Sequence, residues 1–210
     1  GGHALSIPCD VTDRDAVHAA VARVEEVLGP VERLVANAGG GEPTDSVHFD
    51  ATHLARVVAL NLTGTAYCIE AVLPDMLRRK NGHLVAVSSL AAYRGLPGAG
   101  AYSASKAALS NLMESLRVDL KPHGVDVTLL LPGFVRTKTG PVKRKRNKPF
   151  RLELEDATSR MEKAIRSRRP RYAFPLPLAV LARMASLLPA RLFDCAFARR
   201  GRRPTNATEQ

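Results

Sequence analysis

The sequence of 210 residues has only three cysteines, no tryptophan and no long apolar run. Cysteines spread this thinly cannot form a disulfide framework, which favours a reducing, cytoplasmic setting. The longest uninterrupted apolar run, residues 173–182, contains two prolines and is much shorter than the ~20 residues that a membrane-spanning helix needs. We therefore expect neither a disulfide-stabilised secreted domain nor a membrane span. The histidines and cysteines also lack metal-ligand spacing, so we assign no metal site.

Positive charge is abundant but lies at one end of the chain. Residues 1–135 carry 11 Lys and Arg against 14 Asp and Glu, whereas residues 136–210 carry 20 against 6, so the net charges are −3 and +14. A basic tail on a nearly neutral body predicts attraction to an anionic surface, with a merely solvated tail as the alternative. Since no aromatic residues are interleaved with the basic run, we do not expect nucleic acid as the partner.

Short apolar runs alternate with helical patterns from residue 4 to residue 131. This alternation is typical of βαβ units that feed a parallel sheet, so the fold class is α/β in a single compact domain. Strands are predicted at residues 5–8, 33–36, 83–88 and 125–131. A helix capped by Thr12 or Asp13 is predicted up to residue 28. Further helices are predicted at residues 50–79, with a bend or a new turn at Pro74, and at residues 102–120.

The last third of the chain is less regular. We predict a helix at residues 154–168, a short strand at residues 171–174 and an amphipathic helix at residues 176–188; the charge run at residues 143–148 is expected in a loop. Residues 1–175 then form the catalytic domain and residues 176–210 a basic amphipathic extension. Its apolar residues are interleaved with arginines, which fits a helix lying at a membrane interface. A lid or dimer helix packed over the substrate cleft fits equally well.

Polar residues follow the predicted strands, at the positions where ligands of an open parallel sheet bind. They are Asp10, Asn37, Ser89 and the Pro132-Gly133 turn. The sharpest signal is the pair Tyr102 and Lys106, which lie four residues apart and so share one helix face. A nearby ammonium favours the phenolate form of a tyrosine, so Tyr102 is predicted to donate and accept a proton. Ser89 is placed to hydrogen-bond the same substrate oxygen.

Across residues 4–137 the chain resembles the short-chain dehydrogenase/reductase family. The resemblance rests on several motifs in the order in which the family carries them. They are Cys9-Asp10-Val11-Thr12-Asp13, Asn37-Ala38-Gly39, Asn61-Leu62-Thr63-Gly64, Val87-Ser88-Ser89, Tyr102-Ser103-Ala104-Ser105-Lys106 and Pro132-Gly133-Phe134-Val135-Arg136-Thr137. The resemblance implies a Rossmann-like, doubly wound parallel sheet and NAD or NADP as the cofactor.

The resemblance also implies a role for each motif. The catalytic tetrad would be Asn61, Ser89, Tyr102 and Lys106. Tyr102 would exchange a proton with the substrate oxygen while hydride moves to or from the nicotinamide. Lys106 would also hold the nicotinamide ribose, and Asn61 would link it to a water relay. The implied cofactor contacts are Asp10, Val11, Asn37, Ala38, Gly39, Tyr102, Lys106, Pro132, Gly133, Val135 and Thr137.

The chain departs from the family pattern at its beginning. The family's glycine-rich phosphate-binding turn and its first two strands precede the point where this sequence starts, and Gly39-Gly40-Gly41 follows a later strand. We therefore expect a fragment of a longer protein, in which residues 5–8 are detached, paired abnormally against residues 33–36, or separated from them by an open gap. The segment that selects between NAD and NADP is also absent.

We predict an NAD(P)-dependent oxidoreductase that interconverts an alcohol and a ketone or aldehyde of a small, fairly apolar substrate. The alternative is a catalytically silent, truncated homologue that binds a lipid or another partner. By analogy with the family, a homodimer or tetramer forms through the helices at residues 50–79 and 102–120. The expected location is cytoplasmic, with peripheral contact to anionic membranes.

Overall fold

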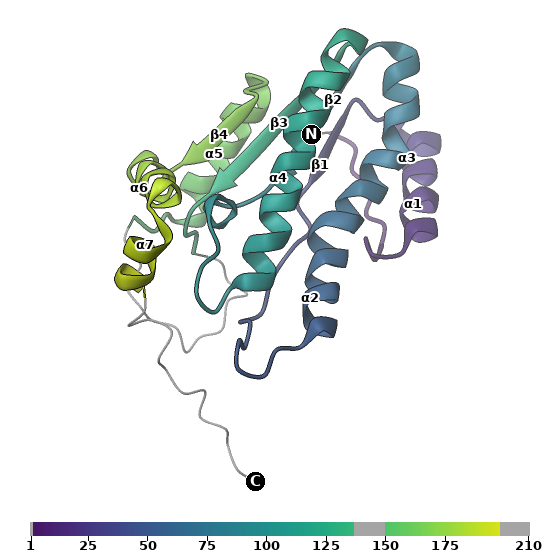
Figure 1. Cartoon of the computed structure of the whole chain (residues 1–210). Helices are drawn as coiled ribbons and strands as arrows, with labels where there is room; N and C mark the ends of the chain where they lie inside the picture. Colours follow the sequence, from purple (N-terminus) through teal and green to yellow (C-terminus); the bar gives the residue numbers. More distant parts are fainter. Residues whose placement is uncertain (1, 137–149, 198–210) are drawn as a thin grey trace.

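The structure is a computed structural model that describes residues 2–136 and 150–197. Its sheet has the strand order β1-β2-β3-β4, and every neighbouring pair is parallel (Figure 1). The strands are β1 (Arg33–Ala36), β2 (Gly82–Val87), β3 (Val125–Pro132) and β4 (Arg171–Phe174). The predicted α/β class and parallel sheet are thus confirmed.

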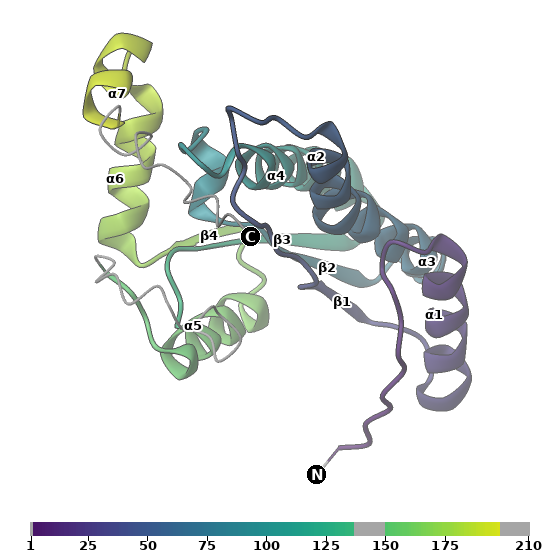
Figure 2. The ribbon, with the colours of Figure 1, turned by 90° about the horizontal axis from the view of Figure 1, so that it is seen from below.

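Helices cover both faces of the sheet, as a doubly wound fold requires. On one face lie α3 (Gly64–Arg79) and α4 (Gly100–Leu120), with α1 (Arg14–Leu28) packed beside α3 beyond β1, and on the other face lies α5 (Leu154–Arg166) (Figure 2). The predicted start of α1 is confirmed, because the Asp13 side chain accepts a hydrogen bond from the Ala16 amide as its N-cap.

The helix predicted at residues 50–79 is interrupted, but not at Pro74. It consists of α2 (Ala51–Val58), a π-helical turn (Ala59–Thr63) and α3, which continues through Pro74. By length and composition the run Ala51–Arg79 could cross a membrane. Within this run, Ile69, Val72 and Met76 are buried against the sheet and the neighbouring helices.

The strand predicted at residues 5–8 is wrong. The segment before α1 has no strand conformation, and β1 is paired only with β2 among the described residues. A strand is stabilised by ladder hydrogen bonds to a neighbour, and residues 5–8 have no neighbouring strand to supply them. The segment is not paired with β1, which agrees with the expectation that residues 5–8 are detached from residues 33–36.

The main core lies between the sheet and the helices α3 and α4. The strands β2 and β3 are almost continuously buried, as expected for strands with helices on both faces. This layer is filled by Met76 of α3, Leu109 and Met113 of α4, and by Leu84, Ala86, Leu129 and Leu131 of the two strands. Val85 and Leu130 instead form a second cluster with Ala164 of α5. Each such side chain contributes about 1.5–3 kcal/mol through burial. The core therefore fixes α4 firmly over the carboxyl ends of β2 and β3.

The remaining helices lie beside β4. They are α6 (Leu176–Leu187) and α7 (Ala190–Phe197), at the edge of the molecule in both views (Figure 1, Figure 2). The helices predicted at residues 154–168 and 176–188, and the strand at 171–174, are confirmed with small shifts of their ends. The predicted loop at residues 143–148 lies outside the described part of the chain.

Candidate active site

The turn that follows β1 passes directly over the residues predicted to be catalytic. A Cβ added to Gly39 would lie 2.7 Å from Asn61 Oδ1 and 3.0 Å from Lys106 Nζ, and one on Gly41 would lie 2.8 Å from the ring of Tyr102. Such distances leave no room for a side chain. The turn therefore needs glycine at these two positions to approach Asn61, Tyr102 and Lys106.

Asn61 connects this turn to α4. It is completely buried in the π-helical turn, where its Oδ1 accepts a hydrogen bond from the Gly40 amide at 2.9 Å. Its Nδ2 donates to the Gly40 carbonyl at 2.8 Å and to Ser105 Oγ at 2.9 Å. Ser105 Oγ in turn donates to the Tyr102 carbonyl at 2.9 Å. The amide of Asn61 thus fixes both the turn and the first residues of α4.

Tyr102 and Lys106 lie one turn apart on α4, as predicted. Lys106 Nζ is 6.0 Å from the centre of the Tyr102 ring and donates to the carbonyl of Val87, the last residue of β2, at 2.8 Å. The lysine is only 4% exposed, and this burial lowers its pKa to about 8. At neutral pH the ammonium form still predominates, so a positive charge remains beside Tyr102.

Two serines at the end of β2 have different environments. Ser88 is buried, and its Oγ donates to the Lys106 carbonyl at 3.0 Å, a carbonyl to which Ser110 Oγ also donates at 2.8 Å. Ser89 Oγ accepts from the Ala91 amide at 3.1 Å. Within the described part of the chain, no acceptor receives the hydroxyl proton of Ser89. Ser88 therefore holds Lys106 in place, whereas Ser89 keeps a donor for an external oxygen.

The turn after β3 joins the site to α6. Pro132 ends β3, and the Gly133 amide donates to the Phe174 carbonyl of β4 at 2.8 Å. A Cβ on Gly133 would lie 2.7 Å from Leu178 Cδ2 and 3.3 Å from Leu90 Cδ1. The start of α6 thus packs directly on the turn. Val135 forms an isolated bridge with Leu152, and Thr137 lies outside the described residues.

Asp10 and Val11, which are among the implied cofactor contacts, lie next to α1 and α3. Val11 packs against Gly64, where a Cβ would lie 2.8 Å from the Val11 carbonyl oxygen. Asp10 is exposed, and its Oδ1 accepts from the Thr12 amide at 2.9 Å and from Thr12 Oγ1 at 2.8 Å, bonds that lower the pKa of the carboxyl. Both contacts within Asp10-Thr12 are local, so Asp10 also serves as a turn residue ahead of α1.

Comparison with known proteins decides the family. Residues 1–148 match the family described as short chain dehydrogenase. The chain belongs to this family. An uncharacterised oxidoreductase from Myxococcus xanthus (strain DK1622) is 45% identical over 195 residues, which cover 90% of this chain and 75% of the relative. In two further curated relatives the matched part is 56% and 55% of their length.

Solved structures of short-chain dehydrogenases resemble the chain in fold. A short-chain dehydrogenase from Streptomyces avermitilis has a TM-score of 0.76 at 26% identity, covering 93% of this chain and 79% of that one. A 7 alpha-hydroxysteroid dehydrogenase, complexed with NADH and 7-oxo glycochenodeoxycholic acid, has a TM-score of 0.58 at 29% identity. That alignment covers 60% of this chain and 49% of the other.

The site around Tyr102 and Lys106 has features that fit a nicotinamide cofactor. Lys106, the side chain that would hold the ribose, uses one of its three N–H donors for the hydrogen bond to Val87, and the described residues provide no second acceptor. Asn37 and Gly39 are exposed on the turn beside it. The site therefore offers free donors and open backbone where the family binds the nicotinamide end of its cofactor.

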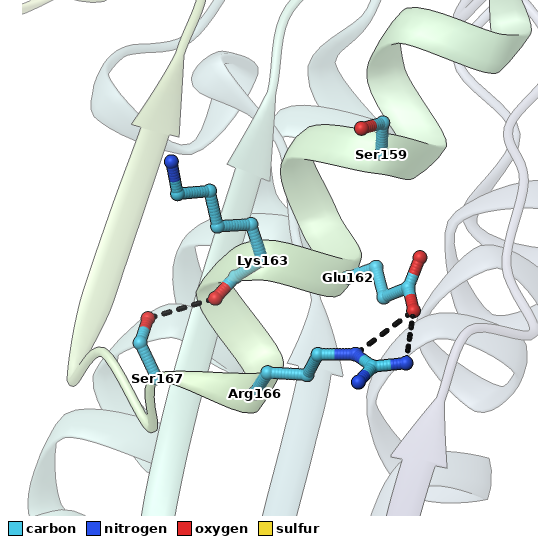
Figure 3. A pocket seen from close by; sticks show the side chains of 5 residues that line it. All are labelled: Ser159, Glu162, Lys163, Arg166 and Ser167. Carbon is cyan, nitrogen blue, oxygen red and sulfur yellow. Dashed lines mark hydrogen bonds and ion pairs between the residues drawn. The ribbon is translucent and has the colours of Figure 1, made fainter.

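Two hollows lie on the face covered by α5, away from Tyr102. The larger, of about 840 Å³, has Val35 and Asn37 of the β1 segment on one side and Met161 and Ile165 of α5 on the other. Figure 3 shows the other one, on the outer side of α5. There Arg166 pairs with Glu162, and Ser167 Oγ donates to the Lys163 carbonyl at 2.8 Å. Because these polar groups are bonded within one helix end, we assign no site to it.

Sequence reasoning missed three residues that shape the site. Ser105 lies inside the Tyr102–Lys106 motif, and its position three residues after Tyr102 places it on the same helix face, but the motif alone implies no role for it. For Gly40 and Gly41 the sequence indicates only that they do not form the phosphate-binding turn. Their close approach to Asn61 and Tyr102 carries no local signal in the sequence.

Proposed function

We propose that this dehydrogenase is an NAD(P)-dependent enzyme that interconverts an alcohol and a ketone or aldehyde. The observation that carries the proposal is the placement of Tyr102 and Lys106 under the β1 turn, with Asn61 clamping the two elements together. Lys106 is held beside Tyr102 by a hydrogen bond to the carbonyl of the half-buried Val87 and by hydrogen bonds from the buried Ser88 and Ser110. A tyrosine and a lysine on an exposed helix face with no catalytic role would not need these hydrogen bonds.

In the proposed mechanism Tyr102 is the general acid and base. Its phenol transfers a proton to the carbonyl oxygen of the substrate during reduction and removes it during oxidation. The ammonium of Lys106 stabilises the phenolate form, and Ser89 donates its free hydroxyl proton to the same substrate oxygen. When bound, the cofactor supplies or accepts the hydride. Asn61 keeps the Tyr102 end of α4 in position through Ser105.

NAD or NADP would be held along the carboxyl ends of the strands. The residues proposed for it are Asp10 and Val11 on the adenine side, Asn37, Ala38 and Gly39 at the β1 turn, Tyr102 and Lys106 on α4, and Pro132, Gly133, Val135 and Thr137 after β3. Lys106 has donors left for hydroxyl groups of the ribose, and this supports its assignment.

The substrate would be small and fairly apolar. Leu90, Pro175 and Leu178 gather around Gly133, at the end of the site where the substrate would meet the nicotinamide. These side chains give that wall no polar group to pair with a charged substrate. We further propose a homodimer or tetramer through α3 and α4, and a cytoplasmic location.

The test is to replace Tyr102 by Phe and to compare it with Tyr67→Phe, a matched change in α3 outside the site. Turnover of a probe ketone such as cyclohexanone, with NADH and NADPH, should fall about 10²–10⁴-fold in Tyr102→Phe only. The affinity for NADH or NADPH, measured by calorimetry, should change within a few-fold because the phenol supplies the proton and not the binding. A Tyr102→Phe variant that kept more than about a tenth of the activity would remove Tyr102 from this role.

A catalytically silent homologue remains the competing hypothesis, and the same measurement separates the two. An enzyme binds NADH or NADPH and turns over at least one probe alcohol or ketone. A silent homologue binds neither cofactor, and its Tyr102→Phe variant is then indistinguishable from the wild type in every assay.

A further inference from the structure

The exposed side of α6 and α7 carries a dense group of apolar side chains. Seven of the sixteen large hydrophobic side chains that are exposed in the described residues fall within residues 176–192. They are Leu176, Val180, Leu181, Met184, Leu187, Leu188 and Leu192, which we call the α6–α7 apolar face. Scattered exposed leucines are ordinary on a protein surface, but a contiguous group marks a surface that another body covers.

Helix geometry makes this group one continuous stripe. Leu176, Val180, Met184 and Leu187 are spaced by three or four residues, so they lie above one another on one side of α6. The opposite side of the helix is also apolar, and its Ala179 is buried in the main core. A helix with apolar residues on two opposite sides is expected to be covered on both of them. Among the described residues, the body of the protein covers only one side of α6.

The orientation of this face is fixed by Arg94. This side chain, from the segment that follows Ser89 and Leu90, donates to the carbonyls of Ala185 at 3.0 Å and Leu188 at 2.6 Å at the end of α6. Its guanidinium also lies 4.0 Å from the centre of the buried Phe193 ring of α7. The two helices are thereby tied to the body, so the outward direction of the stripe is a property of the fold.

Charge indicates what covers the face. Residues 176–210 carry six arginines against two acidic residues, and two of the arginines, Arg183 and Arg191, are exposed within or beside the apolar stripe. Two copies of this chain joined through the face would bring like charges together, which is unfavourable. An anionic surface such as a layer of acidic lipid headgroups would neutralise them.

Length excludes insertion of α6 across a bilayer. The helix has 12 residues, whereas a spanning helix needs about 20. An apolar helix face flanked by arginines is instead the pattern of a helix that lies in the plane of the interface.

We propose that the α6–α7 apolar face docks the protein reversibly on the surface of an anionic lipid bilayer. The leucines and Met184 enter the boundary between headgroups and acyl chains, and Arg183 and Arg191 remain among the headgroups. This inference is independent of the proposed oxidoreductase function, because it concerns the outward side of α6 and no residue of the Tyr102 site.

The test is co-sedimentation of the full chain with vesicles of phosphatidylcholine, alone or with added phosphatidylglycerol, at low and high ionic strength. Binding should require phosphatidylglycerol and should weaken with salt. The double variant Leu181→Ser/Met184→Ser should lose at least about tenfold in partitioning, because two apolar side chains no longer enter the lipid. The matched control Val27→Ser/Leu28→Ser changes two exposed apolar residues at the end of α1 and should bind like the wild type.

A second variant tests the contribution of charge separately from that of apolar burial. Because it changes an exposed side chain, it should fold even if the double variant does not. Arg191→Gln, at an exposed position, should lose several-fold in binding to the anionic vesicles. Equal binding to neutral and anionic vesicles, or no binding to either, would overturn the proposal. So would a dimer in sedimentation equilibrium that Leu181→Ser/Met184→Ser dissociates, since a second copy would then cover the face.

Discussion

His83 is buried in β2 as a neutral imidazole, and this predicts a specific pH dependence of stability. The side chain is completely inaccessible. Arg33 Nε lies 3.1 Å from its Nδ1, and an arginine can only donate, so Nδ1 accepts and the ring proton is assigned to Nε2. Nε2 then donates to Thr128 Oγ1 at 2.8 Å. A second proton on Nδ1 would break the bond to Arg33 and leave a buried charge.

The pKa of His83 falls from 6.5 to about 4, chiefly through burial, with repulsion from Arg33 and Arg168 adding to it and Asp126 opposing it. Because the folded state holds the proton less tightly than the unfolded state, the stabilisation is complete above the unfolded pKa. It is lost as the pH falls toward the folded pKa. With these two values, the free energy of unfolding should drop by about 2 kcal/mol between roughly pH 7.5 and pH 5 through this group alone.

Urea unfolding of the wild type and of His83→Gln, followed across this pH range, measures the effect. The wild type should lose about 2 kcal/mol more than His83→Gln does on acidification, because other titrating groups contribute equally to both. His123→Gln removes an exposed histidine and should follow the wild type. Parallel curves for the wild type and His83→Gln would refute the assignment of a neutral, buried His83.

Two further predictions concern the backbone and the α6–α7 attachment. Gly124 has φ +75°, and a Cβ there would collide with the Lys80 carbonyl, so Gly124→Ala should lower the free energy of unfolding by at least about 2 kcal/mol in urea titrations. Gly95→Ala, in open space, should leave it unchanged. Arg94→Ala removes the hydrogen bonds to the end of α6, so hydrogen exchange should become faster in α6 and α7 and stay unchanged in β2. Unchanged protection in α6 would contradict the role of Arg94.

The elements that the sequence predicts well are those whose signal is local. The capping carboxylate of Asp13, the near-continuous apolar run of β2 and the four-residue spacing of Tyr102 and Lys106 each depend on a few neighbouring residues. Structure confirms all three. Hydrophobic periodicity does not predict that Asn61 lies near α4. The resemblance in motif order does predict it, although Asn61 precedes Ser105 of α4 by 44 residues.

The features that the sequence could not supply depend on partners distant in the chain. Residues 5–8 have a strand-like composition, but a strand exists only where a neighbour completes its hydrogen bonds. The π-helical turn at Ala59–Thr63 has no local marker, whereas Pro74, the expected breaker, is accommodated inside α3. The glycine requirement at Gly39 likewise arises only from the positions of Asn61 and Lys106 in space.

Helix α6 takes part in both the proposed substrate wall and the proposed lipid-docking face. Its inward side reaches the turn at Gly133 through Leu178, next to Leu90 and the segment that follows Ser89, while its outward side carries the apolar stripe. A single α-helix is about 10–12 Å across with its side chains. The wall proposed for an apolar substrate and the face proposed for the lipid surface are therefore separated by one helix. Arg94 also joins the end of α6 directly to the segment after Ser89, so this link between the two faces does not involve the sheet.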